Sequence, residues 1–371
     1  MPLNNVDLYR IDGTIGSVSN IQTSAINGGP IAGARNRVIN GDMRIDQRAA
    51  IVTNTGSYPV DRWKLEFTTS GAVQSAQSND FPTGFSASLL FDVTAADTSI
   101  AAGEYGVLAQ YIEGLNASDL NWGTASAQTA TLSFWVKSTT TGTYCVSFRN
   151  SGASRSYVAT YSVASANTWE YKTITVPGDT SGTWLGTNGV GIIVAFCFAT
   201  GSTFQTTAGA WQAGNFLGTS AQTNLLASTA NEIRITGVQL EPGTVATPFE
   251  RRSYGQELAL CQRYYEVINY LPVGITYAPN GDTRHFTSFA TTKRVAPTMG
   301  GFPHSIVVIA STYLGEGINL NGTLNSAVSS IFGFQANSMG NSVNIGTGAG
   351  GGQIISWGEA FFRTVTASAE L

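Results

Sequence analysis

The recurrence of large apolar side chains at every second position is the feature that most restricts what this chain can fold into. In residues 190–198, Val190, Ile192, Val194, Phe196 and Phe198 occupy every second position. The same period of two recurs in residues 63–67, 132–137 and 144–149. Successive side chains of a β-strand point to opposite faces of a sheet, so each segment places one apolar face on a core. The density of these segments between residues 37 and 252 predicts a jelly-roll β-sandwich.

The strand expected over residues 232–240 changes its parity partway along. Ile233 and Ile235 occupy odd positions, whereas Val238 and Leu240 occupy even ones. A shift of one residue would turn the second pair away from the core. We therefore predict a β-bulge or kink at Gly237.

Composition agrees with an all-β protein and narrows the classes of function. Only 11% of the residues are charged, against about 25% in an ordinary soluble protein. The net charge is −4 and no basic run is present, so we expect no nucleic-acid partner. No stretch of about 18 apolar residues occurs, which argues against membrane insertion. The first residues also lack the basic and apolar blocks of a secretory signal.

A helix is predicted after the sandwich. Ser253 followed by Gln256 is a capping box, and good helix formers continue the segment to residue 266. The apolar face of this helix either packs around a three-fold axis between subunits or lies on the sandwich of its own chain. In the first case, the two arginines that precede the helix could form ion pairs across chains. We take the first alternative as the prediction, and the candidate trimer-interface residues are Arg251, Arg252, Tyr254, Leu258, Cys261 and Tyr265.

Four parts of the chain follow from these patterns. Residues 1–36 are rich in Gly, Asn and Ser and form an attachment segment, and residues 37–252 form the jelly roll. Residues 253–273 contain the junction helix and a linker, and residues 274–371 form a smaller C-terminal β-sandwich domain.

One long segment resembles a known family. Residues 233–266, IRITGVQLEPGTVATPFERRSYGQELALCQRYYE, closely resemble a module junction of bacteriophage tail-fibre proteins. Residues 36–47, NRVINGDMRIDQ, resemble the opening of the same module. Shorter similarities are DRW at 61–63, LSFWVK at 132–137, TWE at 168–170, KRVAPT at 293–298 and the terminal ASAEL.

The resemblance implies a structural fibre protein without enzymatic activity. The first domain would be a jelly roll like those of carbohydrate-binding modules, and three identical chains would associate. The fibre would belong to the tail of a virion, be made in the host cytoplasm and be extracellular after release. Residues 1–36 would attach it to a tail hub or baseplate. Because the family often has a longer N-terminal anchor, attachment to the capsid remains an alternative. The far end would bind host-surface glycans.

Glycan binding requires aromatic platforms that stack on sugar faces. Trp122, Trp184 and Trp211 lie in segments rich in Gly, Ser, Thr and Asn, which indicate loops. An exposed loop tryptophan is less easily explained by packing than one in a strand. These three residues are the candidate glycan-binding set, and burial at a subunit interface is the alternative.

Catalytic and metal chemistry have little support in the sequence. His285 and His304 lie in no catalytic motif, and no G-x-S-x-G elbow offers a nucleophile. The three cysteines, Cys145, Cys197 and Cys261, are too far apart for a zinc site and are expected to be reduced. We expect no cofactor and no metal ligands. Asn280-Gly281-Asp282 is a turn signal whose oxygen-bearing side chains make bound calcium the alternative.

Two other functions remain as alternatives. A capsule-degrading depolymerase would use paired carboxylates, but the repeats of about 20–30 residues typical of a long β-helix are absent. A baseplate or capsid decoration protein would share the fold without binding a receptor.

Overall fold

The computed structural model describes residues 35–268, 282–300 and 365–371, together with short strands at 25–26, 29–30, 275–277, 322–329 and 333–340. Side chains are described for residues 35–268, 289–298 and 366–371. Most of the predicted attachment segment, the two histidines and the possible calcium turn lie outside the residues with described side chains.

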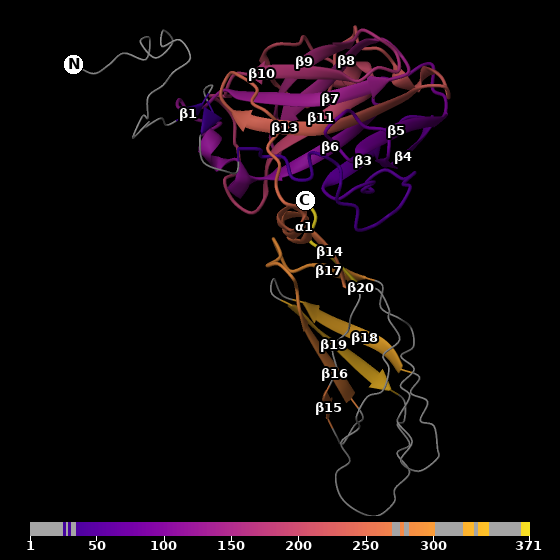
Figure 1. The fold of residues 1–371 in the computed structure, drawn as a ribbon, viewed down its shortest axis with the longest axis vertical. Helices are drawn as coiled ribbons and strands as arrows, with labels where there is room; N and C mark the ends of the chain where they lie inside the picture. Colours follow the sequence, from indigo (N-terminus) through magenta and orange to yellow (C-terminus); the bar gives the residue numbers. More distant parts are fainter. Residues whose placement is uncertain are drawn as a thin grey trace, which may run out of the picture.

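Two antiparallel sheets form a jelly-roll β-sandwich, as the alternation predicts (Figure 1). The five-stranded sheet has the order β10-β7-β13-β5-β4, and the six-stranded sheet has the order β12-β9-β8-β11-β6-β3. The first sheet consists of β4 (Ala72–Ser78), β5 (Ser88–Ala95), β7 (Ala130–Ser138), β10 (Glu170–Val176) and β13 (Glu232–Pro242). The second consists of β3 (Trp63–Phe67), β6 (Tyr105–Glu113), β8 (Gly142–Arg149), β9 (Arg155–Val163), β11 (Val190–Thr200) and β12 (Trp211–Ala213). Single 3-10 turns lie in the loops at Gly114–Asn116, Ser118–Leu120, Ser202–Phe204 and Leu225–Ala227.

The core lies between the two sheets and uses the predicted face of β11. Ile192, Val194, Phe196 and Phe198 all belong to the cluster between the sheets. Val190 was expected on the same face, but it packs against the opposite side of the sheet. The register of β11 against β6 shifts between Val190 and Ile192, so an irregularity at the strand start reverses the direction of this one side chain.

The predicted irregularity at Gly237 is confirmed. The register of β13 against β7 shifts between Thr236 and Gln239, and Gly237 has a φ of 62°. This shift lets Ile235 and Val238 both face the core despite their opposite parity. A left-handed backbone is accessible to glycine and costly for most other residues.

We predict that Gly237→Ala destabilises the sandwich by about 1–3 kcal/mol. An added Cβ would lie 2.6 Å from Cζ of Phe85 and 3.1 Å from Cδ1 of Trp135, on a backbone that alanine disfavours. Equilibrium urea unfolding measures the loss. Gly56→Ala is the matched control, because Gly56 has a φ of 84° and no atom within 4 Å of an added Cβ. Equal losses for the two variants would contradict the predicted steric contribution.

The chain after the sandwich forms one helix and two smaller sheets. Helix α1 (Tyr254–Gln262) is followed by a three-stranded sheet of β14 (Tyr265–Ile268), β20 (Val365–Ser368) and β17 (Thr298–Gly300). A four-stranded sheet has the order β15 (Ile275–Tyr277), β16 (Asp282–Ser288), β19 (Gly333–Gly340) and β18 (Gly322–Ser329). At the other end, β1 (Ala25–Ile26) pairs with β2 (Gly29–Pro30). In Figure 1, α1 and the three-stranded sheet lie between the sandwich and the four-stranded sheet, and the C-terminus returns to α1.

The helix starts where predicted and ends earlier. The Ser253 hydroxyl accepts a hydrogen bond from the backbone N–H of Gln256, which confirms the N-cap. The expected helical face included Tyr265, but this residue opens β14 and pairs with Ser368 of β20. Its assignment to the helix was therefore wrong. Pairing with a strand about 100 positions later outweighs local helix propensity, and no local pattern reveals such a partner.

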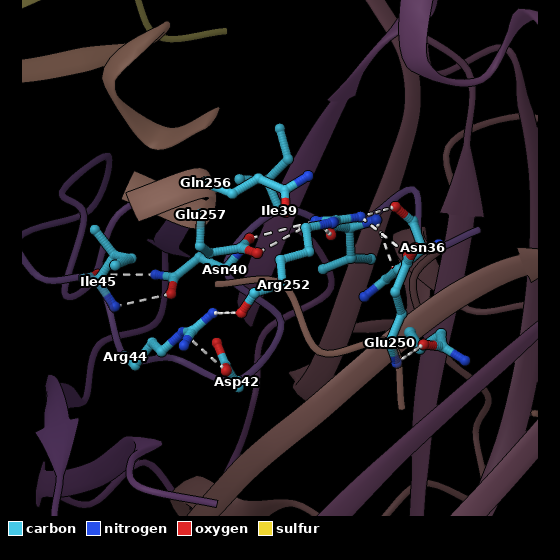
Figure 2. Close-up of polar contacts among 12 residues, drawn as sticks. Asn36, Ile39, Asn40, Asp42, Arg44, Ile45, Glu250, Arg252, Gln256 and Glu257 are labelled. Atoms are coloured by element: carbon cyan, nitrogen blue, oxygen red, sulfur yellow. Dashed lines mark hydrogen bonds and ion pairs between the residues drawn. The ribbon is translucent and has the colours of Figure 1, made fainter. Parts of the chain in front are cut away.

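A polar network joins the start of the sandwich to α1 (Figure 2). The Arg252 guanidinium donates to the carbonyls of Asn36 and Val38 and forms an ion pair with Glu257. The Glu257 carboxylate in turn accepts a hydrogen bond from the backbone N–H of Asn40. The helix is thus held against its own sandwich by contacts within one chain.

Candidate functional site

The three tryptophans predicted to bind glycans lie together. Trp122 and Trp184 have ring centroids 4.9 Å apart, Trp122 and Trp211 are 5.2 Å apart, and Trp184 and Trp211 are 5.3 Å apart. All three pairs are edge-to-face, which is a favourable geometry for aromatic rings. Trp122 is buried, whereas Trp184 and Trp211 are half-buried.

The indole N–H groups of this tryptophan cluster are all used within the chain. Trp122, Trp184 and Trp211 donate to the backbone carbonyls of Gln128, Ser181 and Pro177, at 2.7, 3.1 and 2.7 Å. The rings also pack against the main core. These contacts account for the cluster as packing at the edge of the sandwich, and its role in glycan binding stays a prediction.

The candidate trimer residues differ in how much surface they leave free. Cys261 is fully buried with Ile39, Ile45 and Tyr264, and Leu258 packs against this group. The Tyr265 ring lies under the Arg48 guanidinium, 3.5 Å from its centroid. Tyr254 is 57% exposed, and Arg251 is exposed beside the Phe85 ring. Of the predicted set, Tyr254 and Arg251 thus have the most surface for another chain.

The outer face of the six-stranded sheet carries a second apolar cluster that the sequence analysis did not single out. The side chains on this face alternate along each strand with side chains that point into the core. The buried residues at its centre, here called the floor, are Val107, Ala109, Cys145, Val158, Ile193, Ala195 and Cys197. An outward face of this composition is unusual, because the outer residues of a sandwich are normally polar. Part of the floor is covered by the segment 201–223, through Leu217 and the half-buried Phe204 and Phe216.

Half-buried tyrosines and an ion pair lie on the rest of this outer face. Tyr111 donates a hydrogen bond to Oε1 of Glu66 at 2.8 Å, and Nζ of Lys64 lies 2.9 Å from the same oxygen. Burial and the Glu66 carboxylate raise the pKa of Tyr111 above its ordinary value, so its phenol is protonated at neutral pH. Tyr105 packs edge-to-face on Phe204, with centroids 5.1 Å apart.

Arg149, at the end of β8, lies beneath these groups with few partners. It is 8% exposed, and its register neighbour on β11 is Ile193, which in turn pairs with Tyr111 of β6. Nη1 donates to the Asn215 side-chain oxygen at 2.7 Å, and Nε is buried without a hydrogen-bond partner. Among the described residues, no carboxylate forms an ion pair with this guanidinium.

A second unsatisfied polar atom lies two residues earlier on the same strand. The Ser147 hydroxyl is buried and has no hydrogen-bond partner. Buried polar groups in folded proteins are normally paired, so these two groups leave hydrogen-bonding capacity unused on this side of the sheet. The alternation in residues 144–149 revealed which face these residues share, but not that the opposite face also packs.

Other chemistry is not indicated by the described residues. No group of His, Cys, Asp and Glu side chains in this part of the chain is placed to hold a metal ion. Burial raises the pKa of the Cys197 thiol to about 12, and the Cys145 and Cys261 thiols shift in the same direction, which leaves them protonated and poorly nucleophilic. Within the same residues, no helix has the length and apolar character needed to cross a membrane.

Comparison with known proteins gives structural similarities at low identity. No protein-family model matches the chain, and no curated protein sequence matches it. It is similar to the enzymatically active domain of tailspike protein 4 of bacteriophage CBA120, at 16% identity and a TM-score of 0.31, covering 56% of this chain and 21% of that one. A putative sugar binding protein from Bacteroides thetaiotaomicron has 11% identity, a TM-score of 0.32 and coverage of 56% and 100%. The family 11 carbohydrate-binding module of cellulase Lic26A-Cel5E of Clostridium thermocellum has 10% identity, a TM-score of 0.27 and coverage of 54% and 99%. The chain thus spans about a fifth of the tailspike structure, and its function must be argued from its own residues.

Proposed function

We propose that this chain is a non-enzymatic tail-fibre protein of a bacterial virus that attaches to host cells by binding surface glycans. The observation that carries the glycan-binding part is the outer face of the six-stranded sheet, where half-buried tyrosines lie near an arginine that has no ion pair among the described residues. Sugars are bound by such combinations, because rings stack on their apolar faces while donors and acceptors orient their hydroxyls. Assignment to a tail fibre is supported by the resemblance of residues 233–266.

The outer face fits glycan binding better than the tryptophan cluster does. In the cluster, the rings pack edge-to-face on each other and every indole N–H is already bonded. On the outer face, Tyr105 and Tyr111 are half-buried, and the Arg149 guanidinium makes one hydrogen bond among the described residues, to Asn215. We therefore assign the proposed site to Tyr105, Tyr111 and Arg149.

Homotrimer formation and attachment through residues 1–36 to a tail hub or baseplate complete the proposal. Three sites on one fibre would raise the effective affinity of a weak contact through high local concentration. Native mass measurement of the full chain tests the trimer, and a stable single subunit would contradict it.

A glycan array probed with the full chain tests the binding site. We predict that Tyr111→Ala binds the glycans recognised by the wild-type chain about ten-fold or more weakly, as expected for an aromatic residue central to an interface. Tyr105→Ala is expected to act in the same direction. Tyr171→Ala is the matched control, because Tyr171 is 45% exposed on β10 of the other sheet.

Three outcomes would overturn parts of this proposal. A chain that binds no bacterial surface glycan contradicts the function. Loss of binding in Trp184→Ala with full binding in Tyr111→Ala moves the site to the tryptophan cluster. Release of reducing ends from a bound polysaccharide would show a depolymerase instead.

A further inference from the structure

The outer face also indicates which kind of glycan it takes. Arg149 is 8% exposed, yet it has no carboxylate partner among the described residues and one hydrogen bond, to Asn215. Moving a charged group out of water is unfavourable unless ion pairs and hydrogen bonds replace the lost hydration. Buried arginines are therefore normally paired, and this one is left incomplete.

The neighbouring groups do not neutralise the arginine. Glu66 is the carboxylate that acts on it electrostatically, but Glu66 already pairs with Lys64 and accepts from Tyr111. Two cations, Arg149 and Lys64, with one anion, Glu66, leave a local net charge of +1. The chain as a whole is at −4, so this face differs in sign from the molecule.

The guanidinium keeps its charge and remains within reach of solvent. Burial lowers the pKa of Arg149, and Tyr111 and Glu66 only partly offset that effect. An arginine pKa starts so high that the group is still a cation at neutral pH. The side chain is 8% exposed, and its one hydrogen bond among the described residues is made by Nη1, which leaves Nη2 to donate. Nη2 can therefore donate to a group that arrives from outside.

We infer that the outer face binds an acidic glycan, whose anionic substituent pairs with the Arg149 guanidinium while its sugar ring contacts Tyr105 or Tyr111. This inference rests on the proposed glycan-binding function and specifies its ligand class. Carboxylate and phosphate oxygens share the required chemistry, because both accept charge-assisted hydrogen bonds from the arginine fork. A monoanionic group matches the local charge of +1.

Titration calorimetry of the full chain with three polymers tests the inference. Polygalacturonate carries carboxylates, its fully methyl-esterified form is the matched neutral polymer, and phosphomannan carries phosphates on sugar rings. We expect at least one anionic polymer to bind about ten-fold or more tightly than the methyl ester. Preference for polygalacturonate identifies a carboxylate ligand, and preference for phosphomannan identifies a phosphate ligand.

Arg149→Met isolates the arginine. The variant is expected to bind all three polymers equally and to unfold at the same or a higher temperature, because an unpaired buried charge is replaced by an apolar chain of similar length. Lys172→Met removes a cation from β10 of the other sheet, where Lys172 pairs with Glu170, and should retain the preference for acid. A lower melting temperature with an unchanged preference in Arg149→Met would show that Arg149 only positions Asn215, and the inference would fail.

The two proposals fail in different ways. Equal binding of acidic and methyl-esterified polymers, both abolished by Tyr111→Ala, leaves glycan binding intact and overturns the acidic ligand. Absence of binding to both anionic polymers also overturns it, even when the array shows neutral glycans bound. A chain that binds nothing on the array overturns both.

Discussion

Phe196→Ala is expected to destabilise the sandwich by about 3–5 kcal/mol, the range for deleting a large side chain from a packed core. The Phe196 side chain is fully buried in the centre of β11. Its ring lies 4.9 Å from Phe134 of β7, in the facing sheet, and 6.0 Å from Trp63 of β3. The substitution therefore removes a contact that joins the two layers and leaves a cavity bounded by two rigid rings. Equilibrium urea unfolding followed by tryptophan fluorescence measures the loss.

The control for this variant is the same substitution at the surface. Phe81 is 39% exposed and has no aromatic partner among the described residues. Phe81→Ala should cost less than about 1 kcal/mol, because a surface residue loses little packing. A loss in Phe196→Ala as small as that in Phe81→Ala would contradict the position of this ring at the centre of the core.

Asn40→Ala is expected to cost about 3 kcal/mol or more, although it removes only a small polar side chain. The Asn40 side chain donates to the carbonyls of Ile45 and Asp61, at 2.8 and 2.9 Å, and accepts from the Ile45 N–H at 2.9 Å. These groups are buried, and each one left unpaired costs about 1–3 kcal/mol. Asn40 also has a φ of 56°, a conformation that asparagine tolerates better than alanine.

Two variants separate these contributions. Asn40→Gly removes the same hydrogen bonds but accepts the left-handed backbone, so it should be about 1 kcal/mol more stable than Asn40→Ala. Thermal unfolding and amide hydrogen exchange of α1 follow the effect, since the Asn40 N–H donates to Glu257 on the helix. Faster exchange in α1 is expected in both variants. Wild-type stability in Asn40→Ala would show that Asn40 is not the centre of this network.

Several residues that carry the resemblance to fibre proteins have structural roles in the network at the base of the sandwich. Asn40 lies in the NRVINGDMRIDQ segment, and the side chains of Arg62 and Trp63 in DRW contact Glu370 and the Asn40 carbonyl. Arg252 and Glu257 of the long junction segment complete it. These motifs therefore mark how the module is joined to its junction helix and C-terminus, whereas the proposed ligand face lies outside most of them.

Local patterns in the sequence determined that residues 63–67, 132–137, 144–149, 190–198 and 232–240 form strands, which face of them meets the core with the exception of Val190, where β13 bulges and where α1 begins. Each of these depends on side-chain period, glycine conformation or a cap, all of which act within a few residues. Only the tertiary structure decided that Tyr265 belongs to a strand, that three distant tryptophans pack on each other, and that Arg149 is buried without an ion pair. Those outcomes depend on partners up to about 100 positions away and on what covers the second face of a sheet, which no local period encodes.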